Sequence, residues 1–368
     1  MPRAAVLTGL DQALVIRDDV EVDDPRHGEV RVRVAACGVC RSDLSMQDGT
    51  MPIPMPAVLG HEASAVVEEV GDGVTGLNPG DHVVVSWVPQ CGECFFCQRG
   101  QPQLCQTSDV VLLAGGQLDG TPRLRLDGAP LFQMCATGTF SEITVIPATS
   151  AVKVPDDLPL DVAALLGCAV LTGVGAALNT ATITPGDAVA VVGCGGVGLN
   201  VIQGARIAGA TTIVAVDVNP AKLAAAEAFG ATALVDASRV DPVNAVRDLT
   251  GQRGADVAFE ALGMGGTIHQ TVDMTRRGGQ AVLVGIPRLD VMLNLPVMLG
   301  VVLQERTIKG CWYGSSDIRR DIPRLVELYR DGSLLLDGLV SRRIDLSEVN
   351  DAFAAMKAGD VARSVIVY

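Results

Sequence analysis

A short apolar strand runs directly into a glycine-rich turn in the stretch Ala188-Val189-Ala190-Val191-Val192-Gly193-Cys194-Gly195-Gly196-Val197-Gly198. A helix-like run, residues 199–209, comes after the turn. Glycines here let the backbone approach a pyrophosphate, the helix N-terminus supplies oriented N–H groups, and the last glycine permits close packing of helix on strand. The stretch therefore predicts the first strand, turn and helix of a dinucleotide-binding unit.

A carboxylate stands where such a unit would meet the sugar of its ligand. The strand-like run 212–216 ends at Asp217, 19 residues after Gly198, where a carboxylate can accept hydrogen bonds from both adenosine ribose hydroxyls. Asp217 would repel a 2′-phosphate and no arginine comes directly after it, so NAD is favoured over NADP. Strand and helix patterns alternate onward through 222–230, 255–260 and 279–285, which predicts a doubly wound parallel sheet.

The composition limits the class of protein. A chain of 368 residues exceeds the size at which one hydrophobic core stops growing, so two domains are expected. The net charge of −14 disfavours nucleic-acid and anionic-membrane partners and favours small-molecule chemistry. No signal peptide or long apolar stretch is evident, so we expect neither secretion nor membrane insertion. We expect a cytoplasmic protein whose ten cysteines are reduced, buried or metal-bound.

The first 155 residues have a different pattern of predicted secondary structure from the alternating strands and helices that follow. Short strand patterns such as 63–70 are broken by Gly, Pro and Asp, which predicts a mainly β half. Residues 106–135 have the composition of a long excursion of loop and short strands. From Asp317 onward, helical segments and a final strand at 364–368 are expected to return to the first domain.

Four thiols lie within fifteen residues, at Cys91, Cys94, Cys97 and Cys105. Close Cys-x-x-Cys pairs let short loops wrap a metal, and a closed four-sulfur shell leaves no position for a substrate. The run therefore predicts a structural zinc site. A redox role for one Cys-x-x-Cys pair is the alternative, although it does not explain four cysteines in succession.

A second set of candidate ligands is dispersed along the chain. Cys40, a candidate zinc ligand, lies after a strand-like run, 29–35. Ser42 is placed to take a proton from a zinc-bound oxygen. Asp43 can support the ligands without binding the metal itself. The alternative is that Cys37 and Cys40 are simply two small buried thiols.

His61 comes directly after Gly60, which allows a tight turn, and is the candidate second ligand; Glu62 beside it would support the site or bind transiently. Cys168, in an apolar run, is the candidate third ligand. A lone histidine or cysteine in such surroundings is more often an ordinary core residue.

These motifs occur in the order found in zinc-dependent medium-chain alcohol dehydrogenases, which the chain resembles over nearly its whole length. The excursion at 106–135 resembles the long loop of the branch related to class I and class III enzymes. The resemblance implies a GroES-like, mainly β catalytic domain over 1–169 and 313–368, and a Rossmann coenzyme domain over 170–312. It implies a catalytic zinc on Cys40, His61 and Cys168, a structural zinc on the four-cysteine run, and a homodimer.

The resemblance also assigns coenzyme contacts beyond the glycine turn. Arg41 and Arg363 are assigned to the pyrophosphate, Thr172 and Val197 to the nicotinamide, and Lys222, with Asp217, to the adenosine ribose. For Lys222 and Arg363 the alternative is ordinary solvated charge.

The implied activity is NAD-dependent interconversion of alcohols and aldehydes or ketones, with Ser42 passing the alcohol proton onward. The family's proton path often continues to a histidine where this chain has Ser45, which leaves the exit route open. The family's substrate channel matches a set of mostly large, apolar residues that could equally be core: Met51, Trp87, Met134, Cys135, Ile286 and Trp312.

Three hypotheses for the function are open. A fairly apolar primary or allylic alcohol is the leading substrate class. A thiol-adduct formaldehyde dehydrogenase is the first alternative; glutathione is disfavoured because Asp109 replaces the arginine that holds its carboxylate in that branch, while mycothiol stays open. The second alternative is a non-catalytic structural or NAD-sensing protein, although such relatives would be expected to lose zinc ligands.

Overall fold

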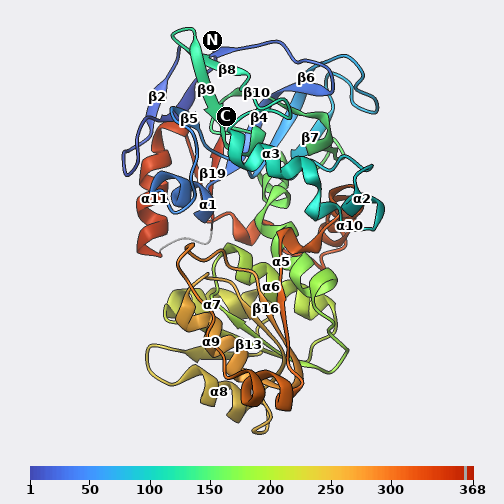
Figure 1. The fold of residues 1–368 in the computed structure, drawn as a ribbon, viewed down its shortest axis with the longest axis vertical. Helices are drawn as coiled ribbons and strands as arrows, with labels where there is room; N and C mark the ends of the chain where they lie inside the picture. The colour runs from blue at the N-terminus through green and yellow to red at the C-terminus, as the bar shows by residue number, and fades with distance from the viewer. Residues whose placement is uncertain (360–362) are drawn as a thin grey trace. The chain divides into compact units, whose positions relative to one another are not determined.

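The computed structural model describes residues 1–359 and 363–368 and divides into two compact units (Figure 1). Unit 1 comprises Met1–Cys168, Asp317–Gly332 and Leu336–Tyr368, and unit 2 comprises Ala169–Ser316 and Ser333–Leu335. Ala169, residues 313–316 and Ser333–Leu335, all expected in the catalytic domain, belong to unit 2. For residues 313–316 the reason is tight packing on helix α5 (Ala169–Gly175), where a Cβ added to Gly314 would lie 2.3 Å from the carbonyl oxygen of Leu171.

Unit 1 is built mainly of strands. One sheet has the order β11 (Ala151–Lys153), β7 (His82–Val85), β6 (Ala63–Val70), β4 (Glu29–Gly38), β19 (Ser364–Val367) and β18 (Arg342–Ile344), with β10 (Ile143–Pro147) also paired to β4. The other has the order β2 (Val15–Arg17), β1 (Ala4–Leu7), β5 (Ala57–Val58), β9 (Ala129–Gln133), β8 (Leu124–Leu126) and β3 (Glu21–Val22). The helices are α1 (Arg41–Gln47), α2 (Phe95–Gln98), α3 (Gln106–Ala114), α4 (Leu160–Ala163), α10 (Ile318–Arg330) and α11 (Val349–Ala358).

Strand β4 carries the chain to the first candidate ligand. Its burial has the two-residue period of a strand, with Val30, Val32 and Val34 buried and Arg33 exposed. The last strand, β19, pairs antiparallel with β4 and brings Ile366 opposite Cys37. The end of β4 is therefore held by a segment from the far end of the described chain.

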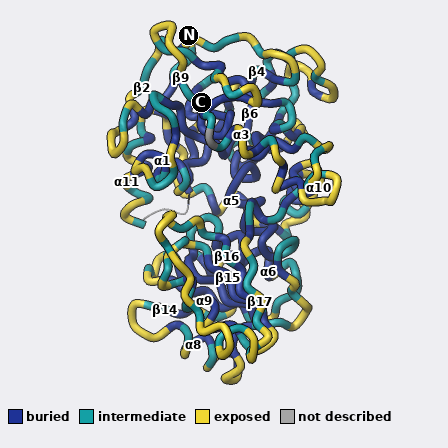
Figure 2. The backbone as a smooth tube through the Cα atoms, in the orientation of Figure 1, coloured by how far each residue is buried: buried dark blue, intermediate teal, exposed yellow. Residues whose placement is uncertain are grey.

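Unit 2 is a parallel sheet of the expected kind. Its order is β14 (Ala233–Asp236), β13 (Thr212–Asp217), β12 (Ala188–Val192), β15 (Ala255–Glu260), β16 (Thr275–Leu283) and β17 (Thr307–Gly310), and every pairing is parallel. Helices α6 (Gly196–Ile207), α7 (Pro220–Ala228), α8 (Pro242–Leu249) and α9 (Gly265–Met274) alternate with these strands. The first strand lies in the middle and the next two lie to one side of it, which is the Rossmann order. Strand β15, next to β12 in the middle of this sheet, is mostly buried (Figure 2).

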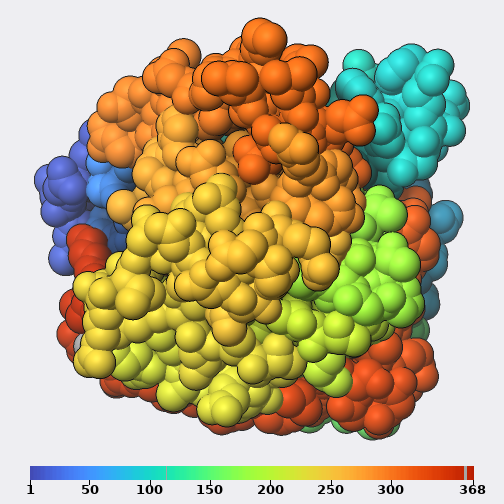
Figure 3. Space-filling view, turned by 90° about the horizontal axis from the view of Figure 1, so that it is seen from below, coloured from blue at the N-terminus to red at the C-terminus, as the bar shows by residue number. Residues whose placement is uncertain are grey.

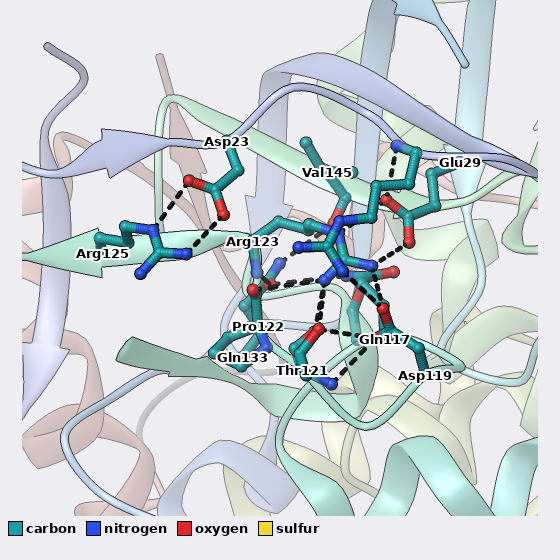
Figure 4. A network of polar contacts seen from close by, with 12 residues as sticks. Asp23, Glu29, Gln117, Asp119, Thr121, Pro122, Arg123, Arg125, Gln133 and Val145 are labelled. Carbon is teal, nitrogen blue, oxygen red and sulfur yellow. Dashed lines mark hydrogen bonds and ion pairs between the residues drawn. The ribbon is translucent and has the colours of Figure 1, made fainter. Parts of the chain in front are cut away.

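The excursion at 106–135 contains the nine-residue helix α3, where loop and short strands were expected. Buried Arg123, 1% exposed, organises the segment after this helix: it donates Nε to Glu29 Oε2 at 2.8 Å and Nη2 to Glu29 Oε1 at 2.6 Å and to Asp119 Oδ2 at 2.7 Å (Figure 4). Two buried amides extend the network, since Gln117 and Gln133 both donate to the carbonyl oxygen of Val145. These polar contacts tie the excursion to β4 and β10, alongside buried apolar residues such as Val111, Leu124 and Leu131.

No single helix among the described residues has the length and apolar character to cross a membrane. One bent pair, Leu160–Gly167 with Ala169–Thr180, meets the length and composition criteria together.

Candidate metal and coenzyme sites

The four cysteines predicted from the 91–105 run converge at one point in unit 1. The Sγ atoms of Cys91 and Cys97 lie 3.9 Å apart, those of Cys94 and Cys105 3.9 Å, and those of Cys105 and Cys91 3.5 Å. Four sulfurs arranged tetrahedrally at a zinc–sulfur distance of about 2.3 Å would lie about 3.8 Å from one another. The sulfur spacing therefore fits a zinc ion.

The second candidate set also converges within unit 1. The ligand atoms of Cys40, His61 and Cys168 all lie within 4.8 Å of one another, and all three residues are buried. Cys40 is the residue before helix α1, and Cys168 comes after the 3₁₀ turn Ala164–Gly167. Two thiols and one imidazole leave a fourth position open in a tetrahedral shell, which is the pattern of a catalytic zinc site.

The turn before His61 requires glycine. Gly60 has φ of 90°, and an added Cβ would lie 2.6 Å from the backbone nitrogen of Phe140. A side chain at this position would be strained by its backbone conformation and would clash. Gly60 therefore fixes where the chain turns to present the His61 ring.

Asp43 holds two of the three ligands from behind. Its Oδ1 lies 3.0 Å from His61 Nδ1 and accepts the Gly60 N–H at 3.1 Å, while its Oδ2 accepts the Cys40 N–H at 2.7 Å. The contact at Nδ1 leaves Nε2 of His61 to face the other ligands. Although burial opposes it, the negative charges of Asp43 and Cys40 raise the pKa of His61 well above its ordinary value.

A buried ion pair borders the same site. Arg363 is 5% exposed, and its Nε lies 3.3 Å from Oε2 of fully buried Glu62, while its Nη1 donates to the Val39 carbonyl oxygen at 3.0 Å. A hydrogen bond with Cys168, together with the positive charges of Arg363 and His61, holds the pKa of the Cys40 thiol well below its ordinary value despite burial. The surroundings thus favour a thiolate at Cys40, which is the form that binds metal.

In unit 2 the glycine turn has the geometry of a pyrophosphate cradle. Gly193 has φ of 94°, and a Cβ on Gly198 would lie 1.8 Å from the Gly193 carbonyl oxygen, so neither position tolerates a side chain. Nothing lies within 4 Å of a Cβ added to Gly195, which leaves open space before helix α6. Asp217, at the end of β13, accepts the Cys194 N–H at 2.8 Å and the Asn219 N–H at 2.9 Å. These bonds hold its carboxylate beside the turn.

Comparison with known proteins shows which proteins this chain is similar to. The family description "Alcohol dehydrogenase GroES-like domain" matches residues 26–156, and "Zinc-binding dehydrogenase" matches residues 196–331. The chain is 39% identical to "Alcohol dehydrogenase class-3" of Drosophila melanogaster, covering all of this chain and 97% of that protein. It is 35% identical to "S-(hydroxymethyl)glutathione dehydrogenase" of Paracoccus denitrificans, covering 100% and 99%. The crystal structure of benzyl alcohol dehydrogenase from Acinetobacter calcoaceticus superposes with a TM-score of 0.94 at 32% identity, covering 100% and 99%.

The chain belongs to the zinc-dependent medium-chain alcohol dehydrogenase family. The predicted family and fold class are confirmed, including the relation to the class I and class III branch. It is an NAD-dependent zinc alcohol dehydrogenase, with zinc and NAD as cofactors.

Several residues matched to the proton path and substrate channel of this alcohol dehydrogenase lie beside the three-ligand site. Ser42 Oγ is 3.9 Å from Cys40 Sγ. The Trp87 ring stands edge-on to His61 with centroids 6.4 Å apart, and Trp87 is 8% exposed. Burial raises the pKa of the Cys135 thiol to about 12, and the charges of His61 and Asp43 also act on it. Cys135 and its neighbour Met134 are both buried, and the Thr137 hydroxyl links this segment to the turn before His61 through the carbonyl oxygens of Met134, at 2.7 Å, and Gly60, at 2.9 Å.

The remaining predicted residues are distributed over the two units. In unit 1, Met51 is half-buried and Arg41, the first residue of α1, is exposed. In unit 2, Thr172 is buried on α5, Val197 and Lys222 are half-buried, Trp312 is half-buried, and Ile286 is 48% exposed. Met51 and Arg41 thus belong to unit 1, and the other five residues belong to unit 2.

The Glu62–Arg363 pair is the contact that sequence reasoning missed. The sequence predicts that Glu62 supports the metal site and that Arg363 contacts the pyrophosphate, but it does not predict that the two residues pair. The available signal was an arginine placed directly before an apolar strand, Ser364–Val367, because an arginine entering a core needs a buried carboxylate.

Proposed function

We propose that this enzyme oxidises a fairly apolar primary or allylic alcohol, or reduces the matching aldehyde, at the three-ligand site. The observation that carries the proposal is the set of side chains beside that site: Trp87, Met134 and Cys135 are all buried and none carries a charge at neutral pH. Such a lining favours an apolar substituent next to the reacting carbon. The likeness to a benzyl alcohol dehydrogenase is consistent with it.

We assign the catalytic zinc to Cys40, His61 and Cys168 and the structural zinc to Cys91, Cys94, Cys97 and Cys105. When bound, zinc at the first site polarises the alcohol oxygen and NAD accepts the hydride. Asp43 orients His61 and the Cys40 backbone, and Glu62 and Arg363 balance the charge of the site. The bulk of Trp87 beside His61 excludes water from the reacting atoms.

Ser42 is assigned to proton transfer. Its hydroxyl lies 3.9 Å from Cys40 Sγ, which is close enough for a substrate oxygen in the open ligand position to hydrogen-bond to it. Ser42 accepts the alcohol proton and passes it onward. Ser45 adds no group that titrates near neutral pH, so the relay beyond Ser42 runs through hydroxyls and water.

For the coenzyme, we assign Gly193, Gly195, Gly196 and Gly198 to the pyrophosphate cradle and Asp217 and Lys222 to the adenosine ribose. Thr172 and Val197 are assigned to the nicotinamide, and Arg41 and Arg363 to the pyrophosphate. Asp217 favours NAD because its carboxylate repels a 2′-phosphate.

A thiol adduct of formaldehyde is the second candidate substrate, favoured by the 35% identity to S-(hydroxymethyl)glutathione dehydrogenase. Asp109 argues against glutathione as the thiol of this adduct. It is an exposed carboxylate on α3 and would repel the carboxylate of glutathione. Initial rates of NAD reduction with benzyl, allyl and short-chain alcohols, compared with formaldehyde plus glutathione or mycothiol, separate the two. A kcat/KM that is highest for a thiol adduct would overturn the alcohol proposal.

We propose that the enzyme is a homodimer formed through unit 2. Strand β17 lies at the sheet edge, and an adjacent segment exposes Leu289, Met292, Val297, Met298, Leu299, Val302 and Leu303. An open strand edge beside such a patch favours pairing with a second copy. Sedimentation velocity of wild type and Met298→Glu tests this, and a wild-type monomer would overturn it.

We also propose a cytoplasmic location. None of the ten cysteines forms a disulfide bond, which is the state that a reducing compartment maintains. Cell fractionation with an antibody against the protein tests the assignment.

A further inference from the structure

A second charged hollow lies in unit 2, apart from the coenzyme turn. It has a volume of about 760 Å³ and is lined by Gly186, Asp187, Arg247, Gln252, Arg253, Asp256, Arg276, Arg277, Gln304 and Arg306. Five arginines against two aspartates make this lining positive in a chain whose net charge is −14. Figure 3 shows unit 2 from below, with the yellow segment near 250 beside the orange segments near 280–310.

The hollow lies at the opposite end of the sheet from the coenzyme turn. Asp187 directly precedes β12, Arg276 and Arg277 lie at the start of β16, and Arg306 directly precedes β17, so the lining gathers at the amino ends of parallel strands. The glycine turn comes after the carboxyl end of β12. A five-residue strand spans about 16 Å, which is too far for one phosphate to contact both places.

The carboxylates in the lining already have partners. Asp256 accepts Arg276 Nε at 2.5 Å and the Ala188 N–H at 2.8 Å, and Asp187 accepts the Thr184 N–H at 2.8 Å. Within the described part of the chain, Arg276 alone among the five arginines forms an ion pair. The positive charge of the others is therefore not cancelled inside the hollow.

Three of these unpaired guanidinium groups are held in place by neutral acceptors. Arg247 Nη2 donates to the Asp273 carbonyl oxygen at 3.0 Å, Arg277 Nε to Gln304 Oε1 at 3.1 Å, and Arg306 Nε to the Thr275 carbonyl oxygen at 2.9 Å. A guanidinium has five N–H donors, so each keeps several for a ligand. Burial and the nearby charge of Arg247 lower the pKa of Arg306, while Asp273 opposes that shift.

We propose that this hollow binds a small polyanion, a molecule carrying two or more phosphate groups. Its volume is that of a pocket for a small metabolite, and planar guanidinium groups match phosphate oxygens in pairs. Grouping like charges destabilises the folded protein, and a bound polyanion relieves that repulsion. The ligand should therefore bind more weakly at high salt and stabilise the fold when bound.

The test uses pyrophosphate as the probe and the enzyme saturated with NAD, so that the coenzyme site is filled. Isothermal titration calorimetry should detect pyrophosphate binding, with inorganic phosphate binding more weakly. Arg277→Gln, at an exposed position, and Arg306→Gln should each weaken binding by about tenfold or more, because each removes charge-assisted hydrogen bonds. Arg239→Gln is the matched control, since that side chain is 78% exposed in unit 2 and pairs with Asp236 outside the hollow.

Thermal unfolding gives an independent readout. At one pyrophosphate concentration, the rise in Tm should be equal for wild type and Arg239→Gln and clearly smaller for Arg277→Gln. Without the anion, Arg277→Gln should unfold at the wild-type temperature or above it, which shows that the variant folds. No binding to the NAD-saturated enzyme, or equal affinity in wild type, Arg277→Gln and Arg306→Gln, would overturn the proposal.

Discussion

Replacing Asp43 with asparagine should separate the metal site from the fold that carries it. Asp43 is fully buried and its two oxygens serve three groups, His61 Nδ1, the Gly60 N–H and the Cys40 N–H. Asparagine keeps the shape but offers one oxygen and one NH₂, so at least one buried donor loses its acceptor. That loss costs about 1–3 kcal/mol of folding free energy.

The effect on the metal is a separate quantity. Removing the partner that orients a histidine ligand typically weakens metal binding about 10- to 100-fold, which corresponds to about 1.4–2.7 kcal/mol. We therefore expect Asp43→Asn to release one zinc to a competing chelator at lower chelator concentration than wild type does. The four-cysteine zinc is retained and serves as the internal reference.

The assay is zinc release to a chromophoric chelator, measured together with kcat and Tm. Asp48→Asn is the matched control because Asp48 is an exposed residue directly after the same helix, α1, and its side chain accepts the nearby Thr50 N–H. If Asp43→Asn lowers Tm but holds both zinc ions as tightly as wild type, Asp43 caps the helix and does not position the metal.

Four further perturbations give distinct readouts. Cys94→Ser should lose one zinc and much soluble yield, because a closed site contributes folding energy directly, and normal yield with one zinc missing would contradict this. Asp217→Gly should narrow the preference for NAD over NADP chiefly by weakening NAD, and equal kcat/KM for both coenzymes in wild type would contradict the premise. Ser42→Ala should lower kcat by roughly 10²–10⁴-fold with zinc content unchanged, and near-normal turnover across the pH range would refute the relay. Although burial opposes it, hydrogen bonds from Arg123 and Thr121 hold the pKa of Asp119 below its ordinary value. Asp119→Asn should therefore lower Tm at neutral pH, and the difference in Tm from wild type should shrink as the pH falls through the acidic range. A difference in Tm that does not change with pH would show that the charge of Asp119 does not stabilise the fold.

Features encoded by neighbouring residues were predictable from sequence. The four-cysteine run spans fifteen residues, and the glycine turn with Asp217 lies within a single strand–helix–strand unit. In both, the spacing along the chain constrains the spacing in space. The parallel sheet was predictable from alternating strand and helix patterns for the same reason.

Features that join distant segments were not predictable in this way. Arg123 and Glu29 are 94 residues apart, and nothing in the sequence near Arg123 distinguishes this buried arginine from an exposed one. The arginines of the unit 2 hollow come from separate connections of the sheet, so only the strand order brings them together. The convergence of Cys40, His61 and Cys168 was inferred from family resemblance rather than from spacing, and the Glu62–Arg363 pair was not anticipated.

The pairing of β4 with β19 imposes an order of events on synthesis. The contact between Val39 and Arg363, at the end of that pairing, joins residues 324 positions apart. A ribosome makes β4, the strand leading to Cys40, long before it makes β19, one of the strands that pair with it, and most of unit 2 is made in between. Unit 2, being nearly continuous in sequence, can fold while the end of β4 is paired with β6 but still lacks β19 on its other side. During this interval the strand end that carries Cys37 and leads to Cys40 is open on the side that β19 later covers, so a growing chain is more vulnerable to oxidation and to the wrong metal until β19 has docked.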